Sequence, residues 1–438
     1  MIKFLHTADL HLGKIFHEQS LIEDQRFMLE GLARILEDRS YRALIIAGDV
    51  YDRSIPSPDA VKLFGSFLAR LKAQRTDLEI LIIPGNHDSP TRLGFGRELF
   101  AELGIRFVTD AGDCDKPVIV RDTAGGARGG GESCAFFLLP FLNPGSLNED
   151  SITAENSSSE TEPLRSQSKL AAAAAARLEQ ARKQCVSNGL TYTVLAAHLF
   201  TAGGMESDSE RIFLGSAERV DIGLFGAFDY IALGHLHRLQ QAGKNGWYSG
   251  SPLAYSFAEA SVPAGAGTEK SFLSVELADG QARVTPLPIK PLRKVSRLSG
   301  SFDWFFRDSV KDRDVCAAEK DFLEILLTDS SITENPLALL RKRFPHILSI
   351  KQDEAFSSLL TNHAGLKAPA AGNGERRDTA GDFEEFLGGL YGQADGEELA
   401  LFRELLAEIE AEEQTGDLNR AAEQRMFPTC DLNRRFPS

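Results

Sequence analysis

The sequence predicts an α/β fold for the N-terminal part of the chain. Three apolar, strand-like runs, IKFLHT, ALIIAGDV and EILIIPGN, alternate with two helical patterns within the first 110 residues. Strands and helices that alternate at this spacing form βαβ units around a parallel, buried sheet. Each run ends in polar residues, and such sheets bind ligands just beyond the carboxyl ends of their strands. We therefore expect a site at one edge of this sheet.

Hydrophobic spacing predicts the elements of the first domain. Helices are expected at about residues 23–37 and 59–73, where apolar residues recur every three or four positions. An alanine-rich run at 170–184 has strong helix propensity and predicts a surface helix. Further strands are expected at AFFLLPFL, TYTVLAAH, DYIALGH, WYSGS and FLSVEL, and the last begins a hairpin that turns at Asp279 and Gly280. The polar, glycine-rich stretches around Gly125 and Ser157 are expected to be loops.

The C-terminal third of the chain has a different pattern of predicted elements. FLEILLT, ENPLALLRKRF and HILSIKQ predict a small strand–helix–strand unit, which is followed by an Ala/Gly/Pro-rich linker and acidic amphipathic helices. The expected parts are a first domain at 1–288, a second at 289–363, a linker at 364–380, helices at 381–414 and a disordered tail at 415–438.

Length and composition limit the classes of protein to which the chain can belong. A chain of 438 residues is long enough for two or three domains, and 42% hydrophobic with 25% charged residues is typical of a soluble globular protein. No apolar run approaches the roughly 20 residues that span a bilayer, and the N-terminus has no signal-peptide pattern. The five scattered cysteines form no CxxC pair, which predicts a reduced, cytoplasmic protein.

The negative charge is concentrated in one segment. Residues 375–417 hold 14 acidic and 3 basic residues, so they account for −11 of the net charge of −15. The remaining −4 is spread over the rest of the chain. Charge therefore neither supports nor excludes a nucleic-acid partner.

Five polar motifs follow apolar runs in the first 237 residues: TADLH, AGDVYD, PGNHD, AAHLF and LGHLH. Their carboxylates, amide and imidazoles are the ligands that two divalent cations need if they share a bridging carboxylate. Asp49 is the candidate bridge, because it ends an apolar strand where a carboxylate without a partner would be costly to bury. Such a centre is typical of hydrolases that act on phosphate esters.

For any single histidine of these motifs, an ordinary hydrogen-bonded core or surface residue is the better explanation. The set as a whole favours the metal centre, because its members all fall at strand ends. His6 lies inside the first strand and is expected to pack in the core. His17, His346 and His363 have no partner by pattern and are expected on the surface.

The order DxH, GDxxD, GNHD, lone H and GHxH resembles the calcineurin-like metallophosphoesterase superfamily. With their flanks, HTADLHLGK, GDVYDRSIPSP, IPGNHDS, YIALGHLHR and YSGSPLAYSF are similar to the SbcD family of nuclease subunits, over roughly residues 1–415. The resemblance implies a four-layer β-sandwich flanked by helices, with a small α+β capping domain and C-terminal helices. It also implies a nuclease domain at 1–288, a DNA-capping domain at 289–363 and partner-binding helices at 381–414.

The same resemblance implies two metal sites, usually with manganese in both. The first would be held by Asp9, His11, Asp49 and His237. The second would be held by Asp49, Asn86, His198 and His235.

His87 stands outside both of these ligand sets. The resemblance implies that it donates a proton to the leaving 3′ oxygen or stabilises charge on the phosphoryl group. Asp52 is assigned to orienting His87, and Asp88 is expected to buttress the turn rather than to take part in the chemistry.

The function implied is that of a metal-dependent DNA nuclease subunit, with double-strand 3′–5′ exonuclease and single-strand endonuclease activity. It would work as a dimer with an SbcC-like SMC ATPase in DNA repair and recombination, in the cytoplasm at the nucleoid. The main alternative is a small-molecule or cyclic-nucleotide phosphodiesterase with the same centre, which would not need the chain after Pro291. A scaffold that binds DNA ends without cutting them is a third hypothesis, and it would not need every ligand.

Contacts with DNA and with the ATPase are predicted more weakly. Candidate phosphate-binding residues beside the motifs are Arg53, Ser54, Ser57, Arg92 and Arg238. A basic cluster at the domain junction comprises Lys290, Arg293, Lys294 and Arg297. An apolar stripe on the acidic helices comprises Leu399, Phe402, Leu405, Leu406 and Ile409. The stripe is expected to dock on the ATPase, and packing against the chain's own cap is the alternative.

Overall fold

The computed structural model of the protein describes residues 1–122, 132–147, 166–201, 219–259, 269–306, 318–329 and 335–352, with parts of 380–407. The chain divides into two units, Met1–Leu326 with Glu334–Lys351, and Leu327–Thr333 with Gln352–Ser438. The predicted loops around Gly125 and Ser157, the tail at 415–438 and nearly all of the linker lie outside the described residues. The predicted domain boundaries remain a prediction.

The first sheet contains the predicted parallel strands. Its order is β14 (Gln281–Pro288), β13 (Ser271–Ala278), β1 (Ile2–Thr7), β4 (Tyr41–Ala47), β5 (Glu79–Ile83) and β6 (Ile105–Phe107). Strands β1, β4, β5 and β6 are parallel, whereas β13 runs antiparallel to β1 and pairs with β14 in a hairpin. The hairpin turns at Asp279 and Gly280, both with positive φ, as the sequence predicts.

The second sheet also contains four parallel strands. Its order is β11 (Gln240–Ala242), β12 (Gly246–Tyr248), β10 (Tyr230–Gly234), β9 (Tyr192–His198), β8 (Ser133–Leu139) and β7 (Val118–Arg121). The four central strands are parallel, and the two edge strands are antiparallel to their neighbours.

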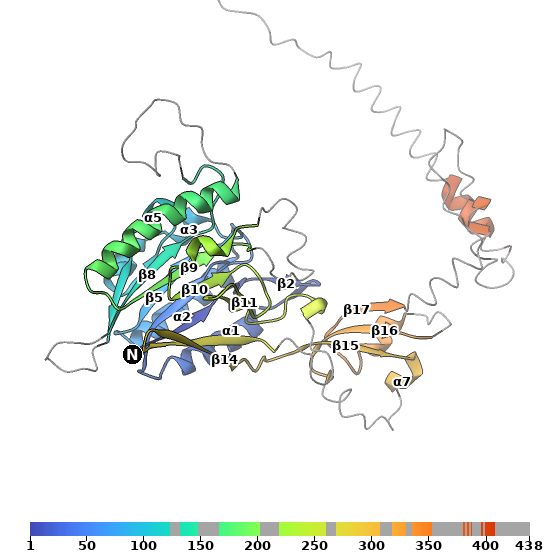
Figure 1. The fold of residues 1–438 in the computed structure, drawn as a ribbon. Coiled ribbons are helices and arrows are strands. Elements are labelled where there is room, and N and C mark those ends of the chain that lie inside the picture. Colours follow the sequence, from blue (N-terminus) through green and yellow to red (C-terminus); the bar gives the residue numbers. More distant parts are fainter. Residues whose placement is uncertain are drawn as a thin grey trace, which may run out of the picture. The chain divides into compact units, whose positions relative to one another are not determined.

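Three long helices cover the outer faces of the two sheets (Figure 1). Helices α1 (Ile22–Ile35) and α2 (Pro58–Gln74) pack on the first sheet, and α5 (Gln167–Ser187) packs on the second. Helix α2 begins where predicted, because the Ser57 hydroxyl accepts a hydrogen bond from the Ala60 N–H and proline occupies the first turn. The alanine run of α5 lies partly buried against its sheet, so this predicted surface helix also forms core.

A third apolar cluster lies between the two sheets, with Phe4 and Ile45 from the first meeting Phe136 and Tyr230 from the second. The layers are therefore helices, sheet, sheet and helix, which is the four-layer sandwich implied by the sequence. Short elements complete the strand ends: β2 (Ile15–Phe16), β3 (Gln19–Ser20), α3 (Pro90–Leu93), α4 (Arg97–Glu102), η1 (Ala111–Asp113), η3 (Ile222–Phe225) and η4 (Phe257–Glu259).

A small three-stranded sheet follows in the chain. Its order is β15 (Val295–Gly300), β16 (Phe322–Leu327) and β17 (Ile347–Gln352). Helix α9 (Pro336–Leu340) lies between β16 and β17 in sequence, as predicted, whereas β15 and α7 (Phe302–Phe306) were not anticipated. His346, expected on the surface, is half-buried with its ring 5.7 Å from that of Phe322.

The predicted acidic helices are described only in part, and their described positions are helical. The Phe383 and Phe402 rings stack 3.8 Å apart, and Arg403 lies 3.3 Å from Glu384. Leu387 and Leu399 are buried. Among the helices that the structure describes, none is long and apolar enough to cross a membrane.

Candidate metal centre

All five motifs meet where the two facing sheets come together. Asp9 and His11 follow β1, Asp49 follows β4, and Asn86 and His87 follow β5 of the first sheet. The second sheet supplies three histidines. His198 is the last residue of β9, and His235 and His237 lie in the turn after β10. The expectation of one sheet edge was therefore wrong: two sheets contribute, because the core between them aligns the ends of β4, β9 and β10.

Four of these residues hold a backbone conformation that is rare outside glycine. The φ angles are 53° at Asp9, 42° at His11, 48° at Asp49 and 106° at His235. Each such residue costs on the order of 1–3 kcal/mol and persists only where the surroundings enforce it. Their concentration at one place is typical of a functional site rather than of a structural core.

The first group of donors gathers around His11. Its Nε2 lies 3.2 Å from Nε2 of His237 and 3.6 Å from Oδ2 of Asp49. The Asp9 carboxylate is fully buried and accepts the His235 N–H at 3.0 and 3.1 Å. Two sets of residues each bring their ligand atoms within 4.8 Å of one another: His11, Asp49 and His87, and Asp9, Asp49 and His198.

The second group gathers around Asn86. Its Oδ1 lies 3.0 Å from Nε2 of His198 and 3.0 Å from Nδ1 of His235, and these two nitrogens are 3.3 Å apart. Nε2 of His198 lies 3.6 Å from Oδ2 of Asp49. The same oxygen of Asp49 thus faces both groups at equal distance.

These spacings fit cation binding. Atoms bound at about 2.1 Å around one cation at angles of roughly 90–110° lie about 3.0–3.4 Å apart. Both pairs of facing ring nitrogens, His11 Nε2 with His237 Nε2 at 3.2 Å and His198 Nε2 with His235 Nδ1 at 3.3 Å, fall in this range. The residues present therefore fit two cations that share Asp49.

Burial keeps the imidazoles in their ligand form. It lowers the pKa of His11 well below the ordinary value and that of His235 to about 3, with the neighbouring imidazoles His237 and His198 as the second cause in each. Burial also lowers the pKa of His198. Neutral imidazoles at pH 7 offer the lone pair that a metal ion needs.

His87 stands beside the first group, half-buried, with its ring 4.7 Å from that of His11. Its Nδ1 lies 2.8 Å from the main-chain oxygen of Asp52, whereas the Asp52 carboxylate lies 2.8 Å from Nζ of Lys14. Residue 52 thus contacts His87 through its main-chain oxygen and not through its carboxylate. A cavity of about 580 Å³ opens here and is lined by Lys14, Ile15, Asp52, Arg53, Ser54, Asn86 and His87.

Asp88 buttresses the turn, as the sequence predicts. Its carboxylate accepts hydrogen bonds from the N–H groups of Gly85, Val50 and Tyr51 at 2.9–3.0 Å. It therefore ties the end of β5 to the end of β4. Burial, and then the nearby Asp49 carboxylate, raise the pKa of Asp88 to about 7.

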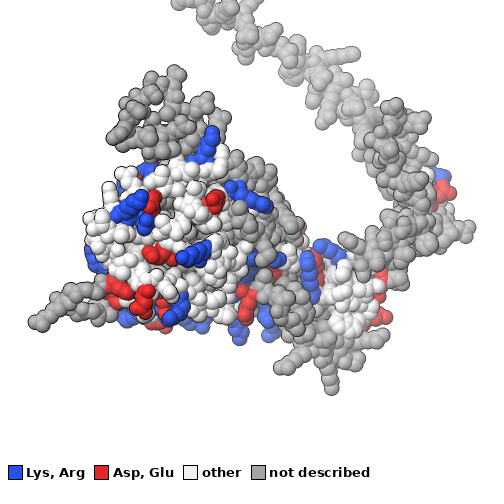
Figure 2. Space-filling model, in the orientation of Figure 1, with Lys and Arg blue, Asp and Glu red and all other residues white. Residues whose placement is uncertain are grey.

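The predicted phosphate-binding residues are not equivalent. Arg53 is exposed and lines the cavity beside His87, and Arg92 is exposed, whereas the Ser57 hydroxyl caps α2. Nε of Arg238 is buried and has no hydrogen-bond partner among the described residues. On the face in Figure 2, acidic and basic side chains are interspersed over the described residues.

The predicted basic cluster is partly neutralised. Arg293 pairs with Asp24 at 2.9 Å and also with Glu23, and Arg297 pairs with Glu324 at 2.6 Å. Two of the four cations of the cluster are therefore paired with carboxylates that are distant in sequence. Lys290 and Lys294 are exposed and form no ion pair within the part of the chain that is described.

Comparison with known proteins decides the family. Residues 2–239 match the calcineurin-like phosphoesterase family, which is more than half of the chain and includes every predicted ligand. The chain belongs to this family. Calcineurin-like phosphoesterases use a dinuclear metal site, and the two donor groups around Asp49 are the candidate ligands here.

One similar protein is the SbcD component of the nuclease SbcCD from Staphylococcus saprophyticus, 28% identical over 361 residues, which are 80% of this chain and 84% of the relative. Among solved structures, TT1561 of Thermus thermophilus aligns with a TM-score of 0.35 and 11% identity, over 65% of this chain and 98% of that one. A dimetal phosphatase from Danio rerio aligns with a TM-score of 0.37 and 12% identity, over 66% and 98%.

The contacts of Glu259 were missed by the sequence analysis. It is 2% exposed, and its Oε1 lies 3.4 Å from Nδ1 of His237. The motif YSGSPLAYSF ends just before it, so a glutamate two residues after a motif was the available signal. Gln25 was missed as well; its side chain donates to the His11 carbonyl at 2.7 Å and accepts from the Gly13 N–H at 2.9 Å.

Proposed function

We propose that the chain is a metal-dependent DNA nuclease subunit that hydrolyses phosphodiester bonds at DNA ends or hairpins, as a double-strand 3′–5′ exonuclease and a single-strand endonuclease. The main observation in support is that Oδ2 of Asp49 lies 3.6 Å from Nε2 of both His11 and His198. His87 lines the cavity beside these residues. The choice of DNA as substrate is supported by the similarity to the SbcD component of the staphylococcal nuclease SbcCD.

Manganese is the proposed metal at both positions. The carboxylate and amide oxygens of the two sets are ligands that suit Mn²⁺, and manganese is the metal that the sequence resemblance implies. The first ion would be held by Asp9, His11, Asp49 and His237, and the second by Asp49, Asn86, His198 and His235. When bound, the ions would lower the pKa of an attacking water and offset charge on the phosphoryl oxygens.

His87 is the proposed proton donor or charge stabiliser. A carbonyl oxygen only accepts hydrogen bonds, so the contact with the Asp52 oxygen places a hydrogen on Nδ1 and makes Nε2 the atom that can exchange a proton. In this role it would act on the leaving 3′ oxygen or on the phosphoryl group. Lys14 and Arg53, on the wall of the same cavity, would contact the flanking phosphates.

The subunit is proposed to work as a homodimer. Phe95, Leu99 and Leu103 are 84%, 78% and 56% exposed and lie four residues apart, in and beside α4. Leu99 and Leu103, in the helix and at its C-terminal cap, share one helix face, and Phe95 directly precedes the N-terminal cap, Gly96. Clustered exposed apolar side chains of this kind mark protein interfaces.

An SbcC-like SMC ATPase is the proposed partner, and DNA repair, recombination and replication at the nucleoid are the proposed setting in the cytoplasm. Leu405 of the predicted stripe on the acidic helices supports this, because it is 49% exposed and Leu401 beside it is 59% exposed. Leu399 of the stripe is buried, and Phe402 stacks on Phe383. The acidic character of these helices disfavours DNA and favours a protein surface.

The test compares two substrates. Purified chain is incubated with Mn²⁺ and either linear duplex DNA or bis-p-nitrophenyl phosphate, with and without the ATPase partner. Nucleolytic products from the duplex, absent for His87→Ala, are expected. Hydrolysis of the small ester alone, even with the partner present, would support the phosphodiesterase alternative, and no hydrolysis of either would support a scaffold.

A further inference from the structure

Two imidazoles of the metal centre each turn one ring nitrogen toward the centre. The other ring nitrogen of each contacts an oxygen atom of the surrounding protein. Nδ1 of His198 donates to the Ala47 carbonyl at 2.9 Å, which leaves Nε2 facing Asn86. His237 has the carboxylate of Glu259 at the corresponding place. We propose that Glu259 is a positioning residue for His237 that sets the affinity of the first metal site. This inference rests on the proposed function.

Glu259 is built into the protein as a fixed acceptor. It ends η4, and its side chain is completely buried. Oε1 lies 3.4 Å from Nδ1 of His237 and accepts from the Ser256 hydroxyl at 3.0 Å. Oε2 accepts from Nζ of Lys270 at 2.6 Å and lies 3.4 Å from the Ser251 hydroxyl. These contacts hold the carboxylate in one orientation.

Lys270 couples the ring of His237 to its backbone. The same ammonium that binds Glu259 also donates to the main-chain oxygen of His237 at 2.9 Å and to Ser251 Oγ at 2.8 Å. The pair of buried Glu259 and half-buried Lys270 therefore contacts both the main chain and the imidazole of a proposed ligand. Lys270 directly precedes β13, which pairs with β1, so Lys270 and Asp9 lie at the ends of neighbouring strands of one sheet.

A carboxylate accepts hydrogen bonds, so its contact favours the hydrogen on Nδ1 of His237. The lone pair then lies on Nε2, the atom that is 3.2 Å from Nε2 of His11. Carboxylates that orient metal-binding histidines in this way commonly change metal affinity by about 10–100-fold when they are removed. Stability alone is a weak reason for a buried ion pair, because desolvation offsets most of its attraction.

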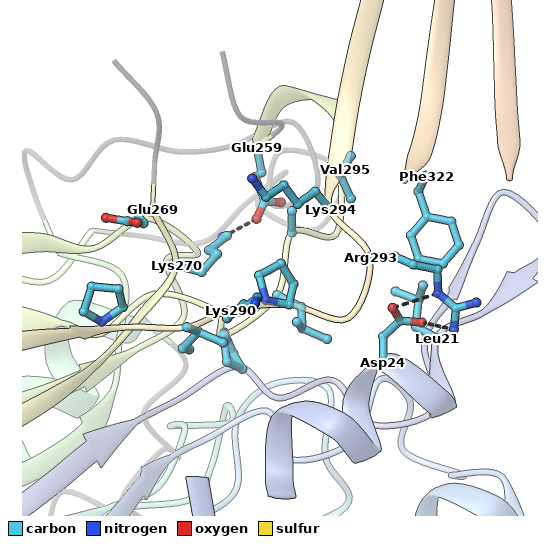
Figure 3. Close-up of a pocket in the computed structure, with 16 residues that line it drawn as sticks. Leu21, Asp24, Glu259, Glu269, Lys270, Lys290, Arg293, Lys294, Val295 and Phe322 are labelled. Atoms are coloured by element: carbon cyan, nitrogen blue, oxygen red, sulfur yellow. Dashed lines mark hydrogen bonds and ion pairs between the residues drawn. The ribbon is translucent and has the colours of Figure 1, made fainter. Parts of the chain in front are cut away.

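The protein supplies a matched control in the same cavity. Asp24 is 2% exposed and pairs with Arg293 at 2.9 and 3.1 Å. Both pairs line one cavity of about 340 Å³, where Figure 3 shows them at separate places in the wall. Asp24→Asn therefore breaks a buried carboxylate–cation pair at this cavity, and the partners of this carboxylate among the described residues include no histidine of the centre.

The experiment titrates Mn²⁺ into the full-length native chain, Glu259→Gln and Asp24→Asn by isothermal titration calorimetry, with circular dichroism as the check on folding. The native chain and Asp24→Asn are expected to bind two ions. Glu259→Gln is expected to bind one ion about 10–100 times more weakly and the other unchanged. Two ions bound natively by Glu259→Gln, or an equal loss in Asp24→Asn, would overturn the inference.

A second measurement needs no variant of Glu259. In the metal-free native chain labelled with ¹⁵N-histidine, long-range proton–nitrogen NMR spectra report the tautomer of His237, identified by its absence in His237→Gln. The hydrogen is expected on Nδ1, and a hydrogen on Nε2 would overturn the inference. If the native chain binds fewer than two ions, the proposed function fails, while this spectrum still decides the role of Glu259.

Discussion

The carboxylate of Asp49 stands where a side chain at Gly85 would begin. A β-carbon on Gly85 would lie 2.1 Å from Oδ1 of Asp49 and 2.5 Å from its main-chain nitrogen. The two residues follow the neighbouring strands β5 and β4, so the glycine allows the strand ends to approach closely. The position of the proposed bridging ligand thus depends on a residue without a side chain.

Gly85→Ala is expected to displace Asp49 and weaken the binding of both metal ions, because backbone and carboxylate atoms cannot both move aside. Calorimetric titration with Mn²⁺ and chemical unfolding measure the two effects. Gly65→Ala is the control, since no atom of the described residues lies within 4 Å of a β-carbon there on α2. That change is expected to stabilise the helix by about 0.5–1 kcal/mol. Equal metal affinity in the two variants would contradict the prediction.

Asp49→Ala is expected to lose both ions, whereas loss of a ligand that serves one site would spare the other. The reason is the single oxygen that faces His11 and His198 at 3.6 Å. Metal content after desalting, measured by inductively coupled plasma mass spectrometry, gives the stoichiometry. Asp59→Ala, on the exposed start of α2, is the control and should keep two ions. Retention of both ions by Asp49→Ala would refute the bridging assignment.

His87→Ala is expected to lower kcat for bis-p-nitrophenyl phosphate by about 10²–10⁴-fold, the range for a lost general acid or base. Metal stoichiometry should stay at the native value, because His87 lies outside both proposed ligand sets. His17→Ala, an exposed histidine in the turn between β2 and β3, should leave kcat unchanged. A His87→Ala protein that has lost its metal ions would instead place His87 among the ligands.

Asp77 is expected to make stability depend on pH in the acid range. Its hydrogen bonds with Arg75 lower the pKa of Asp77 from 3.8 to about 2. A depressed pKa in the folded state adds stability above the ordinary pKa, and this is lost as pH falls from about 4 toward 2. Urea unfolding of the native chain and Asp77→Asn should therefore differ more at pH 5 than near pH 2. An equal difference at the two pH values would be inconsistent with this cause.

Leu99→Glu is expected to turn the proposed homodimer into a monomer, because it places a charge beside the exposed apolar side chain of Leu103 on the same helix face. Size-exclusion chromatography with light scattering measures the mass. Leu224→Glu provides the control at a 43% exposed leucine in η3, away from α4 in sequence. The interface assignment fails if Leu99→Glu keeps the dimer mass, or if native chain is monomeric at micromolar concentration.

Local spacing in the sequence was enough to predict much of the fold. Strands β1, β4, β5, β9 and β10, helices α1, α2 and α5, and the turn at Asp279 and Gly280 lie where the pattern placed them. Periodicity, helix propensity and turn residues act over a few neighbours, so one sequence reveals them. The polar residues that end each strand were visible for the same reason, and the resemblance added their division between two metal ions.

Tertiary structure alone decided which side chains meet across the chain. The donors come from two facing sheets, His87 is oriented by a main-chain oxygen, and Arg293 binds Asp24 rather than a phosphate. Glu259 reaches His237 because η4 packs beside the turn after β10. Spacing along the sequence does not predict such contacts, because they depend on how the side chains on the buried faces of the two sheets pack against each other.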